Sequence, residues 1–266
     1  DLQTPTTYLA IAEDRLPAGH ALRGELSQAR QELLTGLRRM GRGDDPVVPG
    51  AWPGRLADLK QRYIDVYADE HARLVLGPAD DQRRESIMNG ESLRQVLALN
   101  RLNLLPSGDL ESWKQAITSL KTCRSFHPGL LADRPDCPYC TLNPSVAAQG
   151  YNAQVRLLAL DEQLDRMLAN WQSAVVSALE SERARQSLAN MTPAERSAVD
   201  AFLTHPEEPV LPPGFVEAAN KALRGIESMP ISVADLEEAL REGGLPCTAQ
   251  EMRERFGRFM LEVMRG

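Results

Sequence analysis

The hydrophobic residues of this chain recur mostly at three- and four-residue spacing, which is the period of an α-helix. Residues 16–40 carry a first stripe of leucines and end in the turn-forming sequence GRGDDP. A second amphipathic helix is expected over residues 53–76, and two more over residues 80–104 and 109–122, separated by the Pro-Ser-Gly break at 106–108. The pattern predicts an all-α protein built as an irregular helical bundle.

The longest helix is predicted over residues 152–190, at about 1.5 Å per residue a rod of about 58 Å. Its apolar positions alternate three- and four-residue steps: Leu157, Leu160, Leu164, Met167, Trp171, Ala174 and Ala178. This heptad seam favours a coiled-coil-like helix, with the helix of residues 53–76 or the N-terminal segment as its partner. A long core helix of an irregular bundle is the alternative.

The remaining patterns divide the chain into four parts. Residues 1–122 form an N-terminal helical segment, residues 123–144 a cysteine- and histidine-containing loop, and residues 145–190 the long helix. A small helical bundle is expected over residues 191–266. Within this bundle, Thr-Pro-Ala-Glu at 192–195 and Thr-Ala-Gln-Glu at 248–251 are capping boxes, so each predicts the start of a helix.

The composition and net charge of the chain argue against several classes of fold and function. Hydrophobic residues make up 42% of the 266 positions, enough for a core, while the low aromatic content of 5% disfavours an all-β fold. The net charge of −7 argues against a nucleic-acid clamp over the whole surface. No apolar run reaches about 18 residues and no signal peptide is present, so we expect a cytoplasmic protein without membrane contact. The first residue is not Met, and a piece of a longer protein is expected.

The most specific chemical pattern lies in the cysteine loop. Cys137 and Cys140 are spaced C-x2-C, and Cys123 and His127 precede them, which gives C-x3-H-x9-C-x2-C overall. Thiolates and imidazoles in this number are the ligands of tetrahedral structural Zn²⁺. The sequence therefore predicts a zinc knuckle that staples a proline-rich loop, with Cys247 as a more distant alternative to His127 as the fourth ligand.

Two other interpretations of these cysteines stay open. They could be thiols without a metal, or the Cys-Pro-Tyr-Cys sequence could be the active site of a glutaredoxin-like thiol oxidoreductase. The latter requires a β-strand before the motif and a helix directly after it, whereas loop-forming residues flank it on both sides. The other histidines, His20, His71 and His205, are expected to be solvated surface residues.

The sequence offers no catalytic motif. It contains no P-loop, no H-E-x-x-H, no G-x-S-x-G and no G-x-G-x-x-G, so we expect no enzymatic activity from this chain. Arginines gather at both ends of the chain and could contact nucleic-acid phosphates, but glutamates are interleaved with them. Salt-bridged helix surfaces are therefore the preferred interpretation, and a nucleic-acid-binding helical module is the alternative.

Three stretches of the chain resemble the C-terminal part of the large P-loop ATPases of bacterial phage-defence systems, the BREX and phage-growth-limitation type (BrxC/PglY-like proteins). These stretches are Ala-Asp-Leu-Lys-Gln-Arg-Tyr at 57–63, the loop from Cys123 through Cys-Pro-Tyr-Cys at 137–140 to Pro144 with the long helix after it, and Leu236, Leu240, Gly-Gly at 243–244, Pro-Cys-Thr at 246–248 and Arg-Phe at 255–256.

The resemblance implies that an ATPase core lies upstream of this chain. It implies a helical, non-catalytic module that assembles with other defence proteins, with itself or with DNA. No catalytic residue is transferred, because the family's nucleotide-binding motifs have no counterpart here.

Overall fold

The computed structural model of the chain describes residues 3–40, 42, 52–148, 150–224, 233–241, 244 and 248–263. The described residues form an all-α protein, which confirms the predicted class of a helical bundle. They include no β-strand, only an isolated parallel bridge between Leu76 and Thr122. Two compact units divide the chain: a first unit, Asp1–Val175 with His205–Leu211, and a second unit, Val176–Thr204 with Pro212–Gly266. None of the described helices combines the length and the apolar character that a membrane crossing requires.

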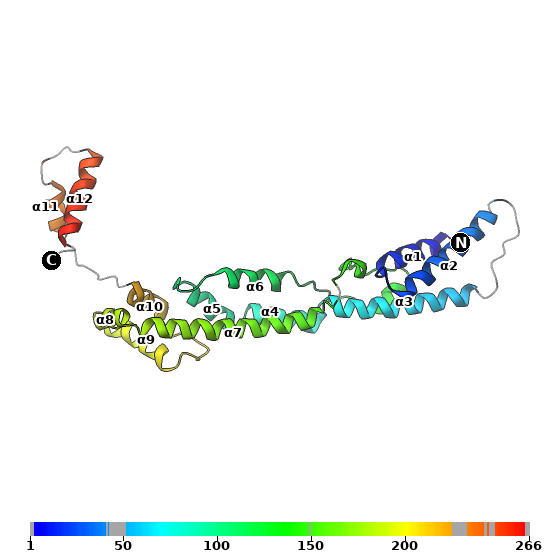
Figure 1. The fold of residues 1–266 in the computed structure, drawn as a ribbon, viewed down its shortest axis with the longest axis horizontal. Helices are drawn as coiled ribbons and strands as arrows, with labels where there is room; N and C mark the ends of the chain where they lie inside the picture. The colour runs from blue at the N-terminus through cyan, green and yellow to red at the C-terminus, as the bar shows by residue number, and fades with distance from the viewer. Residues whose placement is uncertain are drawn as a thin grey trace. The chain divides into compact units, whose positions relative to one another are not determined.

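The first unit begins with three helices that share one core (Figure 1): α1 (Gln3–Arg15), α2 (Ala21–Met40) and α3 (Trp52–Leu74). α1 precedes the stripe that predicted the first helix and was not expected from the sequence, although its buried residues Tyr8, Leu9 and Ala12 follow a helical spacing. The cysteine loop adds its own side chains to this core, whose buried members include Leu9, Leu16, Leu26, Leu59, Tyr63, Tyr67, Leu131, Cys137 and Leu142.

The expected single helix over residues 80–104 is two helices, α4 (Pro78–Met88) and α5 (Glu91–Asn100). Gly90 explains the break between them. A Cβ atom at this position would lie 2.9 Å from the carbonyl oxygen of Ser86, so only glycine lets the chain turn so tightly against the end of α4. The next helix is α6 (Gly108–Thr118).

The long helix is shorter than predicted. α7 runs over Ala153–Leu179, and a separate helix, α8 (Glu182–Ala189), follows. Ser181 causes the interruption, because its hydroxyl group accepts a hydrogen bond from the amide of Ala184 and so caps a new helix. α7 runs beside α4, α5 and α6 (Figure 1), and one buried contact joins it to α6: the indole of Trp113 donates to the carbonyl of Leu160 at 2.7 Å.

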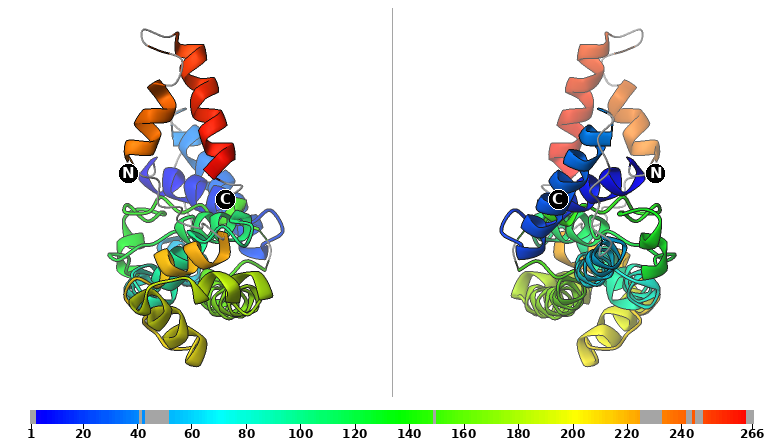
Figure 2. Two further views of the ribbon diagram at one scale, coloured as in Figure 1. Left: turned by 90° about the vertical axis from the view of Figure 1, so that its left-hand side faces the viewer. Right: turned by 90° about the vertical axis from the view of Figure 1, so that its right-hand side faces the viewer.

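The second unit contains short capped helices. α10 (Phe215–Arg224) packs against α8 and against α9 (Pro193–Thr204), while α11 (Val233–Arg241) and α12 (Ala249–Val263) lie side by side (Figure 2). Both predicted capping boxes are confirmed, since Thr192 and Glu195 exchange hydrogen bonds at the start of α9 and Thr248 and Glu251 do so at the start of α12.

Candidate metal centre

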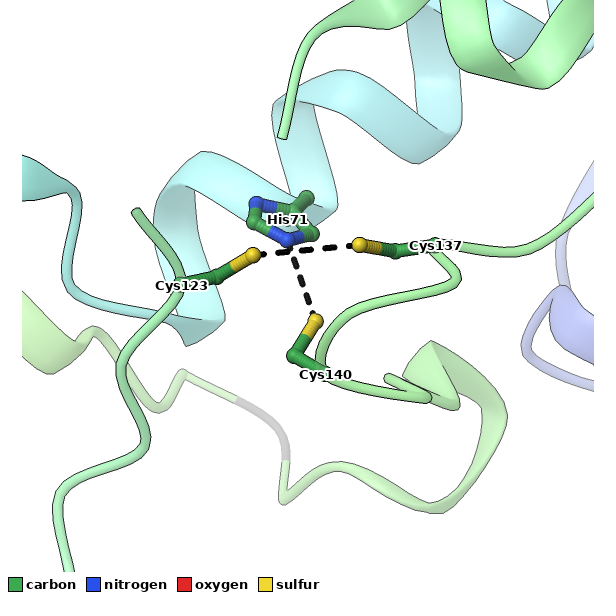
Figure 3. A group of neighbouring side chains, drawn as sticks. All are labelled: His71, Cys123, Cys137 and Cys140. Carbon is green, nitrogen blue, oxygen red and sulfur yellow. Dashed lines mark hydrogen bonds between the residues drawn. The ribbon is translucent and has the colours of Figure 1, made fainter. Parts of the chain in front are cut away.

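Three cysteines and one histidine meet in the first unit. The ligand atoms of His71, Cys123, Cys137 and Cys140, here called the Cys3His cluster, all lie within 4.8 Å of one another. Nε2 of His71 lies 3.2 Å from Sγ of Cys140, and the Sγ atoms of Cys123 and Cys137 lie 3.8 Å apart. Figure 3 shows the four side chains pointing toward a common centre. This arrangement could hold a metal ion.

Each ligand comes from a segment with a defined position. His71 lies in the last turn of α3. Cys123 follows directly after the bridge between Leu76 and Thr122, so main-chain hydrogen bonds fix its backbone. Cys137 and Cys140 lie at the ends of one tight turn, in which the amide of Thr141 donates to the carbonyl of Cys137 at 3.2 Å. Short 3-10 helices, η1 (Pro128–Ala132) and η2 (Pro144–Val146), flank that turn.

A row of aromatic residues on α3 holds the loop in place. Tyr63, Tyr67 and His71 are spaced four residues apart, so they lie on the same face of the helix. The Tyr63 hydroxyl donates to the carbonyl of Pro135, and the Tyr67 hydroxyl donates to the carbonyl of Leu142 at 2.9 Å. These bonds satisfy loop carbonyls that the loop itself leaves without helix or sheet partners.

Packing also orients the imidazole of His71. The ring stacks on Phe126, with centroids 3.8 Å apart and planes 14° from parallel. The ring of Tyr67 lies tilted beside both, at 6.4 Å from His71 and 6.2 Å from Phe126. A ring held in this way presents one nitrogen to the cysteines without loss of side-chain entropy at the moment of binding.

Burial controls the protonation of the cluster. His71 is 4% exposed, and burial lowers the pKa of its imidazole to about 4. Burial likewise raises the pKa of the Cys140 thiol to about 12. The imidazole is therefore neutral at pH 7 and offers a lone pair, while the thiol needs a nearby positive charge before it ionises. A divalent cation supplies that charge when thiolates bind it.

The structure brings together three of the four ligands named from the sequence, and it places His71 with them in the position expected for His127. His127 is exposed and precedes η1, where Gly129 lies next to its ring. The expectation that His71 is a solvated surface residue is wrong, because α3 turns it into the core. The alternative ligand Cys247 lies outside the described residues.

The fold and the cluster define the class of the molecule: an all-α protein with a largely buried Cys3His cluster where the cysteine loop packs on α3. Two segments are similar to consecutive domains of a family of unknown function (DUF6079). Residues 1–71 match its fifth domain and residues 79–170 its sixth domain. No curated protein and no solved structure matches the chain. His71 is the last residue of the first matched segment, and all three cysteines lie in the second.

Proposed function

We propose that this chain is a non-catalytic helical assembly module stabilised by one structural Zn²⁺ ion in the Cys3His cluster. The observation that carries the proposal is the convergence of one imidazole and three thiols, from segments far apart in the sequence, on a single point. Three thiol sulfurs with one nitrogen form a soft ligand set, which favours Zn²⁺ over the oxygen-seeking Mg²⁺ and Ca²⁺.

The distances support tetrahedral zinc. With Zn–S bonds of about 2.3 Å, two thiolates of a tetrahedral site lie about 3.8 Å apart. The Sγ atoms of Cys123 and Cys137 have this separation, 3.8 Å. Nε2 of His71 lies 3.2 Å from Cys140 Sγ, slightly closer than a shared zinc ion would hold them, so a small outward movement of Cys140 would complete the site.

A structural role fits this ligand set better than a catalytic one. Catalytic zinc sites keep one position open for water or substrate, whereas four protein ligands close the coordination sphere. His71, Cys123 and Cys137 are buried and Cys140 is half-buried, so three of the four ligands are shielded from solvent. The site instead lies where η1, η2 and the C-x2-C turn pack onto α3, and a metal there would join these short elements to the helix.

The two alternative functions receive less support. A glutaredoxin-like enzyme needs a strand before the C-x2-C motif and a helix directly after it, and the described residues on either side form turns and η2. For nucleic-acid binding, the N-terminal arginines would have to be free to contact phosphates. Arg30 instead pairs with Glu13 at 3.0 Å, and Arg23 donates to the carbonyl of Leu16 at 3.1 Å.

The cellular setting that we propose is phage defence, with this module working as the accessory part of a P-loop ATPase. Its support is the sequence resemblance around the cysteine loop. Its test is the efficiency of phage plating on a host whose chromosomal gene carries Cys137→Ser. Loss of protection with unchanged protein abundance would support the proposal, and full protection would contradict the need for the metal site in defence.

The metal proposal is tested by elemental analysis of protein purified without added metal. We expect one zinc ion per chain in the unaltered protein, and its loss together with thermal stability in Cys137→Ser and in Cys140→Ser. Protein that carries no metal, while both variants melt as the unaltered chain does, would rule out the structural zinc site.

A further inference from the structure

The joint between α3 and α4 is short and coincides with a domain boundary. α3 ends at Leu74 and α4 begins at Pro78, so only Val75, Leu76 and Gly77 connect them. The two family matches end at residue 71 and resume at residue 79, on either side of this joint. Contacts between the two sides of the joint therefore connect two segments that match separate domains of the family.

Residues 121–124, at the start of the cysteine loop, contact the chain before, at and after the α3–α4 joint. Before the joint, the thiol of Cys123 meets His71 in the Cys3His cluster. At the joint, the amide of Leu76 donates to the carbonyl of Lys121 at 2.9 Å, and the amide of Cys123 donates to the carbonyl of Leu76 at 2.9 Å. After the joint, Nε of Arg124 donates to the carboxylate of Asp81 on α4 at 2.6 Å.

These contacts depend on one another because they are made by consecutive residues. Cys123 directs its side chain to the cluster and its amide to Leu76, and Arg124 is the next residue. Asp81 is 2% exposed and also pairs with Arg84 at 2.8 Å, so the carboxylate that receives Arg124 is itself held in place. A ligand bond at Cys123 therefore fixes the backbone that positions both the bridge and the ion pair.

We infer that the metal ion in the Cys3His cluster holds the two matched segments together across the α3–α4 joint and fixes the direction in which α4 leaves α3. The cluster, the Leu76 main-chain bonds and the Arg124–Asp81 pair are together called the clasp. This inference rests on the proposed zinc site. Without the metal, Cys123 loses its ligand bond and the three-residue joint of Val75, Leu76 and Gly77 becomes a hinge. The metal thus sets the geometry that the module presents to its partners.

Other contacts also connect the two segments, since the buried hydroxyls of Tyr63 and Tyr67 on α3 donate to carbonyls of the cysteine loop. Arg73 on α3 donates to the carbonyl of Tyr151, and further along the same segment Gln154 binds Asp80 and Arg83 pairs with Asp161. The last two contacts are exposed to solvent, where screening and side-chain entropy leave little net stabilisation. We therefore expect metal loss to loosen the joint without separating the helices.

Hydrogen exchange of the full chain tests the clasp. The amides of Leu76 and Cys123 are followed with zinc bound and after removal of zinc by a chelator, with the zinc content measured in the same samples. We expect both amides to exchange at least about tenfold faster after removal, while amides of α9 in the second unit keep their rates. If the chain binds zinc but the exchange rates at Leu76 and Cys123 do not change when zinc is removed, the clasp is overturned and the zinc site is retained. Protein without zinc would overturn both.

A variant separates the clasp from the metal site itself. Arg124→Gln removes the charge that pairs with Asp81 and with Glu85 but leaves every cluster ligand in place. We expect this variant to retain one zinc per chain and to show faster exchange at the amide of Asp81, in the first turn of α4. Arg94→Gln, which breaks an exposed pair within α5, is the matched control. Equal exchange at Asp81 in the two variants would overturn the α4 half of the clasp.

Discussion

The hydroxyl group of Tyr67 accepts a hydrogen bond from the amide of Cys137 at 3.1 Å. The same hydroxyl donates to the carbonyl of Leu142 at 2.9 Å, so one side chain of α3 binds the backbone on both sides of the C-x2-C turn. The contact is buried, and burial raises the pKa of the Tyr67 phenol to about 12, which keeps its proton available for donation. Tyr67 therefore positions the turn that carries two of the four cluster ligands.

Replacing Tyr67 with Phe should destabilise the fold without removing a ligand. The change leaves the amide of Cys137 and the carbonyl of Leu142 without their partner, and an unsatisfied buried polar group costs about 1–3 kcal/mol. We expect the free energy of unfolding of the metal-loaded chain, measured by urea denaturation, to fall by about that amount. Tyr139→Phe is the control, because Tyr139 is 60% exposed. Similar unfolding curves for both variants would show that the Tyr67 hydroxyl does not support the turn.

The helical class was predictable because amphipathic periodicity is a local property. The cysteines of the cluster were predictable for the same reason: Cys123, Cys137 and Cys140 lie close in sequence, and a C-x2-C turn is short. His71 was not, because it comes from a helix that precedes the loop by several elements. His127 was the preferred fourth ligand because it lies between Cys123 and Cys137 in the sequence, but tertiary packing determines which residues meet at a metal site.

One signal in the sequence points toward His71. Tyr63, Tyr67 and His71 share one face of the predicted helix at residues 53–76, and the two tyrosines already belonged to its apolar stripe. A histidine that continues a buried stripe faces the core, where it needs a polar or metal partner. The break of the long helix at Ser181 was harder to foresee, because serine is tolerated inside helices. Only the hydrogen bond that its side chain accepts from the amide of Ala184 shows that a new helix begins there.

The ion pair of Asp81 should make stability depend on pH in the acid range. Burial raises the pKa of this carboxyl group, but the hydrogen bonds from Arg124 and Arg84 outweigh burial, so its pKa lies below the usual value. The pair stabilises the fold fully above the pKa of the unfolded chain, near 4, and this contribution is lost as the pH falls through the lower pKa of the folded state. Asp81→Asn should destabilise the fold by about 1–3 kcal/mol at pH 7, because hydrogen bonds between charged groups are replaced by weaker ones to a neutral amide.

The measurement is urea denaturation of the unaltered chain and of Asp81→Asn between pH 7 and pH 3. We expect the difference in unfolding free energy between them to shrink as the pH falls below about 4. Glu111→Gln, which breaks the exposed pair with Lys114, should change stability by less than about 1 kcal/mol across the range. A constant difference at every pH would exclude the Asp81 carboxylate as its source.

The capping box at the start of α9 gives a prediction for the second unit. The hydroxyl of Thr192 accepts from the amide of Glu195, and the carboxylate of Glu195 accepts from the amide of Thr192 at 2.9 Å. Thr192→Ala removes the hydroxyl and should lower the unfolding free energy of the second unit by about 1 kcal/mol, whereas Thr192→Ser should retain most of the stability. Calorimetry of both variants measures this, and equal melting temperatures would argue against the cap.

The fourth ligand is decided by comparing His71→Ala with His127→Ala. Loss of a group that only orients a metal ligand already lowers affinity about ten- to a hundredfold, so loss of a ligand should cost at least about a hundredfold. We expect His71→Ala to release zinc to a colorimetric chelator at concentrations where the unaltered chain and His127→Ala retain it. The competition is followed by absorbance, with the total zinc of each sample measured beforehand.

The His71 variant also removes a ring from the core, so a loss of zinc could follow from poorer packing alone. His71→Phe separates the two causes, because it keeps an aromatic ring stacked on Phe126 but offers no lone pair. If coordination is responsible, His71→Phe loses zinc as completely as His71→Ala does. Retention of zinc by His71→Phe, with loss in His127→Ala, would return the fourth position to His127 and would place the metal on the loop alone, leaving α3 outside the site.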